Sequence, residues 1–298
     1  TRDSILMIEG FAREMPEDLM ADAVLKAQEY VATLCEMQEE LAEKVGVVKK
    51  EYTPPEDDGL FDRIRQQYYD ALYQASQTEG KQARAEACTA VKERAQAELI
   101  PDPTAGDAIP VERFRIVWHD LEQRVVRDMI LAGKRLDGRD NTTLRDIECK
   151  VDVLPRVHGS ALFQRGETQA LVTVTLGTGR DEQRVDGLVE EYSEKFMLHY
   201  YFPSFSVGEV RPIRGPGRRE MGHGALAERS VKPVLPDPDA FPYTIRIISD
   251  ILESNGSSSM ASVCGATLGL MAAGVPISNP VAGISVGLVQ EEDRYVLL

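Results

Sequence analysis

Apolar residues recur at intervals of three and four between residues 17 and 45, as they do along one face of an α-helix. The same spacing continues beyond two proline-containing breaks, at residues 52–55 and 101–103. It predicts three further helices, over residues 58–77, 81–97 and 110–132, the last with Pro110 in its first turn. The pattern therefore predicts an all-helical domain.

After Gly133 apolar and polar residues alternate instead, which is typical of β-strands. Residues 147–153 alternate strictly and predict a half-buried strand. Other β-rich runs predict a buried strand over 4–10, strands over 168–176 and 243–247, and a hairpin of 281–290 and 294–298 around 291–293. The predicted fold class is α+β: an all-helical domain, then a domain of mixed β-sheets packed with helices.

The chain has 298 residues, a length typical of about two domains. Both of its ends fall inside predicted strands, so we expect a fragment that is cut at both ends. The sequence holds no apolar run of about 18 residues and no signal peptide, which predicts no membrane segment. Four cysteines lie far apart in the sequence, at Cys35, Cys88, Cys149 and Cys264. Their spacing excludes a cysteine zinc site and a disulfide scaffold, and fits the reducing cytoplasm.

Charge is distributed unevenly along this acidic chain, whose formal net charge is −15. Residues 1–128 hold 27 acidic and 16 basic residues, a net charge of −11, whereas residues 129–298 have a net charge of −4. A basic cluster lies within residues 211–232 and comprises Arg211, Arg214, Arg218, Arg219, Arg229 and Lys232. The cluster is either an irregular surface loop or a contact for a polyanion, since arginine suits forked recognition of phosphate.

Three consecutive serines, Ser257, Ser258 and Ser259, follow Gly256 and precede a run rich in Ala, Leu and Met. That run predicts a helix over residues 259–273, ended by Gly274 and Pro276. Hydroxyl groups, unpaired N–H groups and the positive end of the helix dipole would then converge, which suits phosphate binding. The alternative is simple capping of the helix, for which one serine is enough.

A second candidate is the segment GRREMGHG, residues 217–224, with paired Arg218 and Arg219 and a glycine-flanked His223. Such a group suits stabilisation of charge on a transferring phosphoryl group. The alternative is a helix entry in which Glu220 and the glycines serve backbone geometry.

Two further motifs are less specific. Asp137 stands between Arg135 and Arg139 in RLDGR, which predicts a local ion-pair cluster at a turn. The segment 156–168 joins two predicted strands, and is either a hairpin surface or a source of further basic residues for the site.

Together these blocks resemble the polynucleotide phosphorylase family, the polyribonucleotide nucleotidyltransferases. The resemblance rests on RLDGR (135–139), GRREMGHG (217–224) and the longer blocks at 154–178, 241–265 and 273–289. It implies that residues 1–16 are the tail of a first RNase PH-like domain and 17–128 an all-helical linking domain. Residues 129–298 would be the N-terminal part of a second RNase PH-like domain.

The resemblance implies processive 3′-to-5′ phosphorolysis of single-stranded RNA, with release of nucleoside diphosphates, and the reverse polymerisation, in mRNA turnover. Carried over to this sequence, Ser258 and Ser259, with Ser257 beside them, would hold the attacking inorganic phosphate. Arg218 and Arg219 would contact the terminal phosphates of the RNA, and His223 would support the same site.

The resemblance also implies a Mg²⁺ or Mn²⁺ cofactor, whose expected ligands lie beyond Leu298. It implies a homotrimeric ring and possible partners in RNA-degradation complexes. We therefore expect the parent protein to be an enzyme and this fragment alone to be inactive.

Two other functions are compatible with the pattern. One is a catalytically silent ring subunit that binds RNA or scaffolds assembly, although keeping both the serine run and GRREMGHG favours an active site. The other is a protein-interaction role for the helical half, whose negative charge would keep RNA off its surface. The residues that follow Leu298 would separate the enzyme from the silent subunit.

Overall fold

The computed structural model describes residues 1–53, 58–105, 108–188, 190–212 and 215–298. The chain divides into two compact units. One contains residues 1–54, 148–164 and 168–283, and is called the sheet unit below. The other contains residues 55–147, 165–167 and 284–298, and is called the helical unit. Pro54 and Pro55 of the first predicted break, and Arg214 of the basic cluster, lie outside the described residues.

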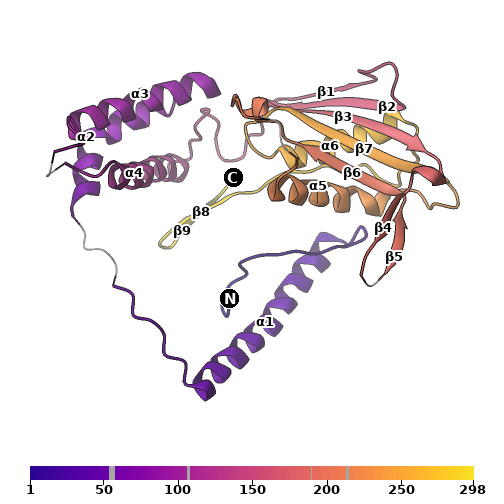
Figure 1. Cartoon of the computed structure of the whole chain (residues 1–298), viewed down its shortest axis with the longest axis horizontal. Coiled ribbons are helices and arrows are strands. Elements are labelled where there is room, and N and C mark those ends of the chain that lie inside the picture. Colours follow the sequence, from indigo (N-terminus) through magenta and orange to yellow (C-terminus); the bar gives the residue numbers. More distant parts are fainter. Residues whose placement is uncertain (54–57, 106–107, 189, 213–214) are drawn as a thin grey trace. The chain divides into compact units, whose positions relative to one another are not determined.

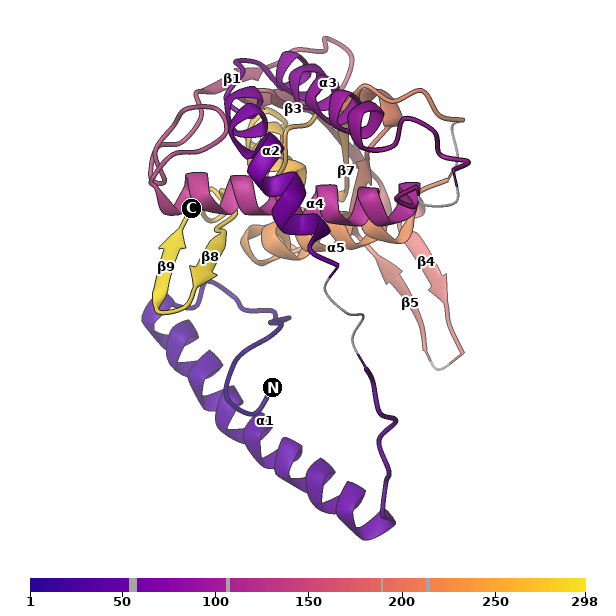
Figure 2. The ribbon, with the colours of Figure 1, turned by 90° about the vertical axis from the view of Figure 1, so that its left-hand side faces the viewer.

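Three helices form the core of the helical unit: α2 (Leu60–Ala75), α3 (Lys81–Leu99) and α4 (Val111–Leu131). Figure 2 shows them as one group, and their bounds confirm the three predicted helices to within a few residues. Pro110 is the N-cap residue of α4 rather than part of its first turn. Its ψ of 131° is extended, while its carbonyl accepts the N–H of Phe114 at 3.0 Å.

Aromatic side chains fill the centre of this core. Trp118 is fully buried, and its ring lies 5.7 Å from that of Phe114 and 6.1 Å from that of Tyr68. The indole N–H donates to Glu122 at 2.8 Å, so burial leaves this polar group satisfied. The apolar face of α4 thus supplies most of the large side chains that hold the unit together.

The β8–β9 hairpin also belongs to the helical unit. It consists of β8 (Leu288–Glu291) and β9 (Arg294–Leu297), which are shorter than the predicted arms because residues 281–287 form no strand. Arg124 of α4 forms ion pairs with both Asp128 and Glu291. Arg294 donates to the carbonyl of Leu131 at 3.1 Å. The hairpin is therefore attached to α4 by charged groups.

The long helix α1 (Glu17–Val45) begins and ends where the periodicity predicts, with Gly46 in the left-handed conformation that ends a helix. None of its residues is buried, and the buried core of α2–α4 contains no residue from it. The prediction of a buried strand over residues 4–10 is wrong. This run is irregular, and Leu6 is 84% exposed. Within the described residues no strand pairs with it, and a strand requires such a neighbour.

The sheet unit is built on a five-stranded sheet with the order β1-β2-β3-β7-β6 (Figure 1). Its strands are β1 (Ile147–Val151), β2 (Gly159–Arg165), β3 (Thr168–Gly177), β6 (Phe196–Tyr201) and β7 (Thr244–Glu253). β7 lies antiparallel to β3 and parallel to β6. β6 is the last strand in this order and therefore forms one edge of the sheet. A separate hairpin of β4 (Gln183–Asp186) and β5 (Glu191–Glu194) projects from the sheet.

The predicted strands are present, with two differences. β1 forms where the alternation predicts, yet all five of its residues are exposed rather than half-buried, because none of them belongs to the hydrophobic core of the sheet unit. β2 and β3 are neighbours joined at Gly166, which supports the hairpin interpretation of residues 156–168. The strands β2, β4, β5 and β6 were not predicted as separate elements.

Helices α5 (Arg218–Val231) and α6 (Ser258–Ala272) pack on one face of the sheet. Gly265 and Gly269 of α6 face the side chains of Val172 and Val174, and a Cβ at Gly265 would lie 2.6 Å from Val172 Cγ2. These glycines let the helix approach β3 closely. The described residues of the unit also form three short 3₁₀ turns, at Gly179–Asp181, Ser204–Val207 and Lys232–Val234.

Candidate phosphate and RNA site

The serine run lies at the N-terminus of α6, as its sequence context predicts. Ser257 is the N-cap residue, with φ 55° and ψ 40°, whereas a capping serine is normally extended. A left-handed conformation costs a non-glycine residue about 1–2 kcal/mol. Ser258 and Ser259 begin the helix and are 5% and 9% exposed. The run therefore places one left-handed and two buried serines at the start of α6.

Ser258 has a side-chain partner that lies on the edge strand. Its Oγ is 2.7 Å from the hydroxyl of Tyr200 in β6. Burial raises the pKa of Tyr200, which keeps its hydroxyl protonated at neutral pH. The backbone of Ser258 is also fixed, because its carbonyl accepts the hydroxyl of Ser262 at 3.1 Å.

The segment GRREMGHG forms the first turns of α5. Glu220 accepts the backbone N–H of Gly217 at 2.7 Å, so it closes the start of the helix, as the helix-entry interpretation expects. Its other oxygen accepts the N–H of Phe202 at 3.2 Å, just after β6. Arg218 and Arg219 follow the cap directly and are both exposed. The positions of these arginines suit an incoming polyanion.

His223 faces the same tyrosine as the serine run does. Its ring meets that of Tyr200 edge-on, with 5.3 Å between centroids and 82° between planes. Burial lowers the pKa of His223, and the positive charge of Arg219 lowers it further. The imidazole is therefore neutral at pH 7. His223 offers a hydrogen bond to the site rather than a permanent charge.

The structure brings three of the six predicted site residues together around Tyr200. Ser258 and His223 contact it directly, and Arg219 acts electrostatically on both Tyr200 and His223. Ser259 follows Ser258 in the same helical turn, and Ser257 precedes it. Arg218 extends into solvent at the start of α5. Tyr200 is not among the predicted site residues, although the apolar and aromatic run from Phe196 to Tyr201 is typical of a buried strand.

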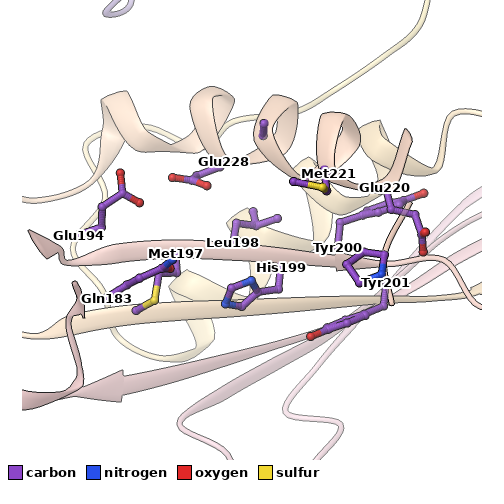
Figure 3. A pocket seen from close by; sticks show the side chains of 13 residues that line it. Gln183, Glu194, Met197, Leu198, His199, Tyr200, Tyr201, Glu220, Met221 and Glu228 are labelled. Atoms are coloured by element: carbon purple, nitrogen blue, oxygen red, sulfur yellow. The ribbon is translucent and has the colours of Figure 1, made fainter. Parts of the chain in front are cut away.

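A cavity of about 300 Å³ lies along β6, between the edge strand and α5 (Figure 3). Among the described residues that line it are three carboxylates, Glu194, Glu220 and Glu228. Burial raises the pKa of Glu228, and the charge of Glu194 raises it further. None of the six predicted site residues is among these lining residues, and the acidic lining does not suit phosphate. The cavity therefore adjoins the candidate site, with which it shares Tyr200 and Glu220.

The RLDGR motif forms the predicted ion-pair cluster, in the helical unit. Asp137 lies 2.8 Å from Arg139 and 3.6 Å from Arg145. Hydrogen bonds and charge from Arg139 lower the pKa of Asp137 against the opposing effect of burial. Arg145 takes the place that the sequence analysis gave to Arg135. The motif organises a turn rather than a site.

Within the part of the chain that the structure describes, no three His, Cys, Asp or Glu side chains converge as a metal site would require. No described helix combines the length and apolar character needed to cross a membrane.

Two family models match the chain, one on each part. Residues 59–140 match the polyribonucleotide nucleotidyltransferase RNA-binding domain, and residues 143–276 match domain 1 of the 3′ exoribonuclease family, RNase PH. The first description names RNA binding for the acidic helical segment, so the expectation that its charge keeps RNA away finds no support there.

Curated relatives match the whole chain. A polyribonucleotide nucleotidyltransferase of Rhodopirellula baltica is 68% identical over 299 residues, which is all of this chain and 40% of that protein. Proteins of the same name from Oleidesulfovibrio alaskensis and Rhizobium meliloti are 48% and 46% identical, and the chain spans 40% and 42% of their lengths.

The sheet with its two helices, the serine run and the arginine–histidine segment together define an RNase PH-like domain, preceded in the chain by a helical domain. The chain belongs to the polyribonucleotide nucleotidyltransferase family and corresponds to about two fifths of the length of the relatives it matches.

Proposed function

We propose that the full-length protein containing this chain degrades single-stranded RNA processively from its 3′ end by phosphorolysis. The reaction releases nucleoside diphosphates and is reversible as RNA polymerisation, in mRNA turnover. The observation that carries this proposal is the convergence of Ser258 and His223 on Tyr200. Through Tyr200, the start of α6, which suits an anion, lies close to the start of α5, which carries the exposed arginines.

The chemistry requires charge placement more than a strong base. An oxygen of inorganic phosphate attacks the terminal phosphorus of the RNA. The bond from that phosphorus to the 3′ oxygen of the preceding nucleotide breaks, and this oxygen leaves with a proton. Phosphate is already ionised at neutral pH, so the protein chiefly orients it and offsets negative charge.

Each candidate residue has a role in this scheme. Ser257, Ser258 and Ser259, with the N-terminal N–H groups of α6, hold the attacking phosphate. Arg218 and Arg219 contact the terminal phosphates of the RNA. His223, neutral at pH 7, donates or accepts a hydrogen bond beside them.

We further propose a Mg²⁺ or Mn²⁺ ion in the full-length enzyme, held by residues beyond Leu298. It would supply charge neutralisation to the transferring phosphoryl group. The described residues of this chain do not fit such a site, because no cluster of three metal-ligating side chains occurs among them. Their contribution is hydrogen bonding and positive charge.

The proposal extends to organisation. Residues 1–16 would be the tail of a first RNase PH-like domain, 17–128 the helical linking domain and 129–298 the front of a second one. Full-length chains would assemble as a cytoplasmic homotrimer that threads single-stranded RNA, with partners from RNA-degradation complexes. This fragment alone would be inactive.

The reverse reaction tests the proposed function. Full-length protein, Mg²⁺ and a short RNA primer are incubated with ADP, and both primer length and released inorganic phosphate are measured. Extension with equimolar phosphate release supports the proposal. Extension with ATP and release of pyrophosphate would contradict it, and so would the absence of extension with either nucleotide.

Replacing Arg218 by alanine should weaken RNA binding and lower its salt dependence. The exposed guanidinium at the start of α5 neutralises one RNA phosphate, so the slope of log K against log salt should fall by about one. Fluorescence titration at several salt concentrations measures the slope. Arg211→Ala is the matched control, because Arg211 is already paired with Glu209 at 2.9 Å. An equal slope for Arg218→Ala and the unaltered protein would exclude this contact.

A further inference from the structure

Two hydroxyl groups meet in the interior of the sheet unit, where hydrogen-bond direction matters. Tyr200 and Ser258 are 4% and 5% exposed, and their oxygens lie 2.7 Å apart. They come from different elements, β6 and α6, and are 58 residues apart in sequence. Either oxygen is able to donate, so the chemistry of the site must decide the direction.

Anion binding sets that direction. A serine hydroxyl has one proton and two lone pairs, so it serves an anion only when its proton points at the anion. If Ser258 donated to Tyr200, its proton would be used and its lone pairs would face the phosphate. If Tyr200 donates to Ser258, the serine proton is left for the phosphate oxygen. Burial keeps the Tyr200 hydroxyl protonated and therefore able to donate.

We propose that Tyr200 is a positioning residue for phosphate: its hydroxyl donates to Ser258 Oγ and thereby orients the serine proton toward the attacking anion. This inference rests on the proposed function, because it assigns a new residue to the phosphate site. Tyr200 itself need not touch phosphate. It acts through Ser258. Its edge-on contact with the ring of His223 fixes the plane of the tyrosine ring.

The surroundings of Tyr200 hold it rigidly enough for such a role. Glu220 of α5 accepts the N–H of Phe202, two residues further along the chain. Glu228, two turns later on the same helix, accepts a backbone hydrogen bond from Leu198, two residues before Tyr200. Glu220 and Glu228 are eight helical residues apart, and Leu198 and Phe202 are four residues apart along the strand. Both separations are about 12–13 Å, so each carboxylate lies opposite the N–H group that it accepts. Glu220 and Glu228 are both labelled in Figure 3.

The packing of α5 against the strand adds a further constraint at this point. A Cβ at Gly224 would lie 3.4 Å from that of Tyr200, so the helix backbone passes directly over the tyrosine. The start of the tyrosine side chain is therefore packed against α5, and its ring meets that of His223. Removal of the hydroxyl alone leaves all of these packing contacts in place.

The test is Tyr200→Phe in the full-length protein, which removes the hydroxyl and keeps the ring. The loss of one buried hydrogen bond predicts an increase in KM for phosphate of about 3- to 10-fold, with kcat and the KM for RNA changed less than about 2-fold. Tyr69→Phe is the matched control. It removes a tyrosine hydroxyl that donates to Asp128 at 2.8 Å in the helical unit, and should leave the KM for phosphate unchanged.

The sign of the effect distinguishes the two hydrogen-bond directions. An unchanged or lower KM for phosphate in Tyr200→Phe would overturn the inference, because it would mean that Ser258 donates to the tyrosine. A double-mutant cycle with Ser258→Ala tests the route. If Tyr200 acts through Ser258, the tyrosine change has no further effect once the serine hydroxyl is gone. An equal effect in both backgrounds would also overturn the inference.

Direct binding of inorganic phosphate, measured by calorimetry on the same variants, separates this inference from the proposed function. If the unaltered protein binds phosphate but does not release nucleoside diphosphates from RNA, the proposed function fails. Weaker phosphate binding by Tyr200→Phe than by Tyr69→Phe would still support the tyrosine's role. Equal phosphate binding by the two variants, or none by the unaltered protein, would refute it.

Discussion

Replacing Ser258 and Ser259 together by alanine is expected to lower kcat/KM for phosphate by at least about 100-fold, because each hydrogen bond to a charged group is worth about 1.5–3 kcal/mol. The two hydroxyls begin α6, where the helix dipole also favours an anion. The backbone N–H groups remain, so some phosphate use should persist. Initial rates of nucleoside diphosphate release over a range of phosphate concentrations measure the change.

The matched control for this pair is Ser206→Ala. Ser206 is also a buried serine of the sheet unit, but its hydroxyl donates to the carbonyl of Pro203 at 2.7 Å, and no site role is assigned to it. Light scattering on all variants should show the same assembly as the unaltered protein. If the serine pair can be removed with no change in phosphate dependence, the serine run does not hold the attacking anion.

Replacing Trp118 by alanine is expected to lower the free energy of unfolding of the helical unit by about 3–5 kcal/mol. Trp118 is fully buried, its ring packs on Phe114 and Tyr68, and its N–H is satisfied by Glu122. The substitution leaves a large cavity and removes the N–H group that donates to the carboxylate of Glu122. Urea unfolding followed by far-ultraviolet circular dichroism on the full-length protein measures the loss.

Ile116→Ala is the comparison for the tryptophan change. Ile116 lies two residues earlier on α4 and is 49% exposed, so its removal should change stability by less than about 1 kcal/mol. Equal losses of stability for the two variants would contradict the description of α4 as the element that fills the core.

Local periodicity predicted the helices well because it reports directly on which face of a helix is apolar. α1, α2, α3 and α4 all lie close to the predicted ranges. The same local signal misled at residues 4–10. Ile5, Leu6, Met7 and Ile8 are apolar, but a strand forms only beside another strand, and sequence periodicity does not show whether that neighbour exists.

Burial proved harder to predict than the elements themselves. Ile147, Cys149 and Val151 alternate as in a half-buried strand, yet β1 is an edge strand that contributes no residue to the core of the sheet unit, and it stays exposed. β6 escaped prediction because it is apolar or aromatic at almost every position and so shows no alternation with polar residues. Its place at the other edge of the sheet follows from long-range pairing with β7.

In the candidate site, too, local motifs could be predicted from the sequence, whereas the way in which they meet could not. The serine run and GRREMGHG could be recognised because their residue types suit phosphate chemistry and stand at helix starts. Their meeting point could not be recognised. Tyr200 joins Ser258 and His223 only through the packing of β6 against α5 and α6, and residues 200, 223 and 258 share no local pattern.

The central claim is phosphorolysis, and the products of RNA breakdown test it most directly. Full-length protein is incubated with single-stranded RNA and Mg²⁺, with and without inorganic phosphate, and the released nucleotides are identified by mass spectrometry. A phosphorolytic enzyme would release nucleoside diphosphates only when phosphate is present. Nucleoside monophosphates released at the same rate without phosphate would show a hydrolytic nuclease and would contradict the account.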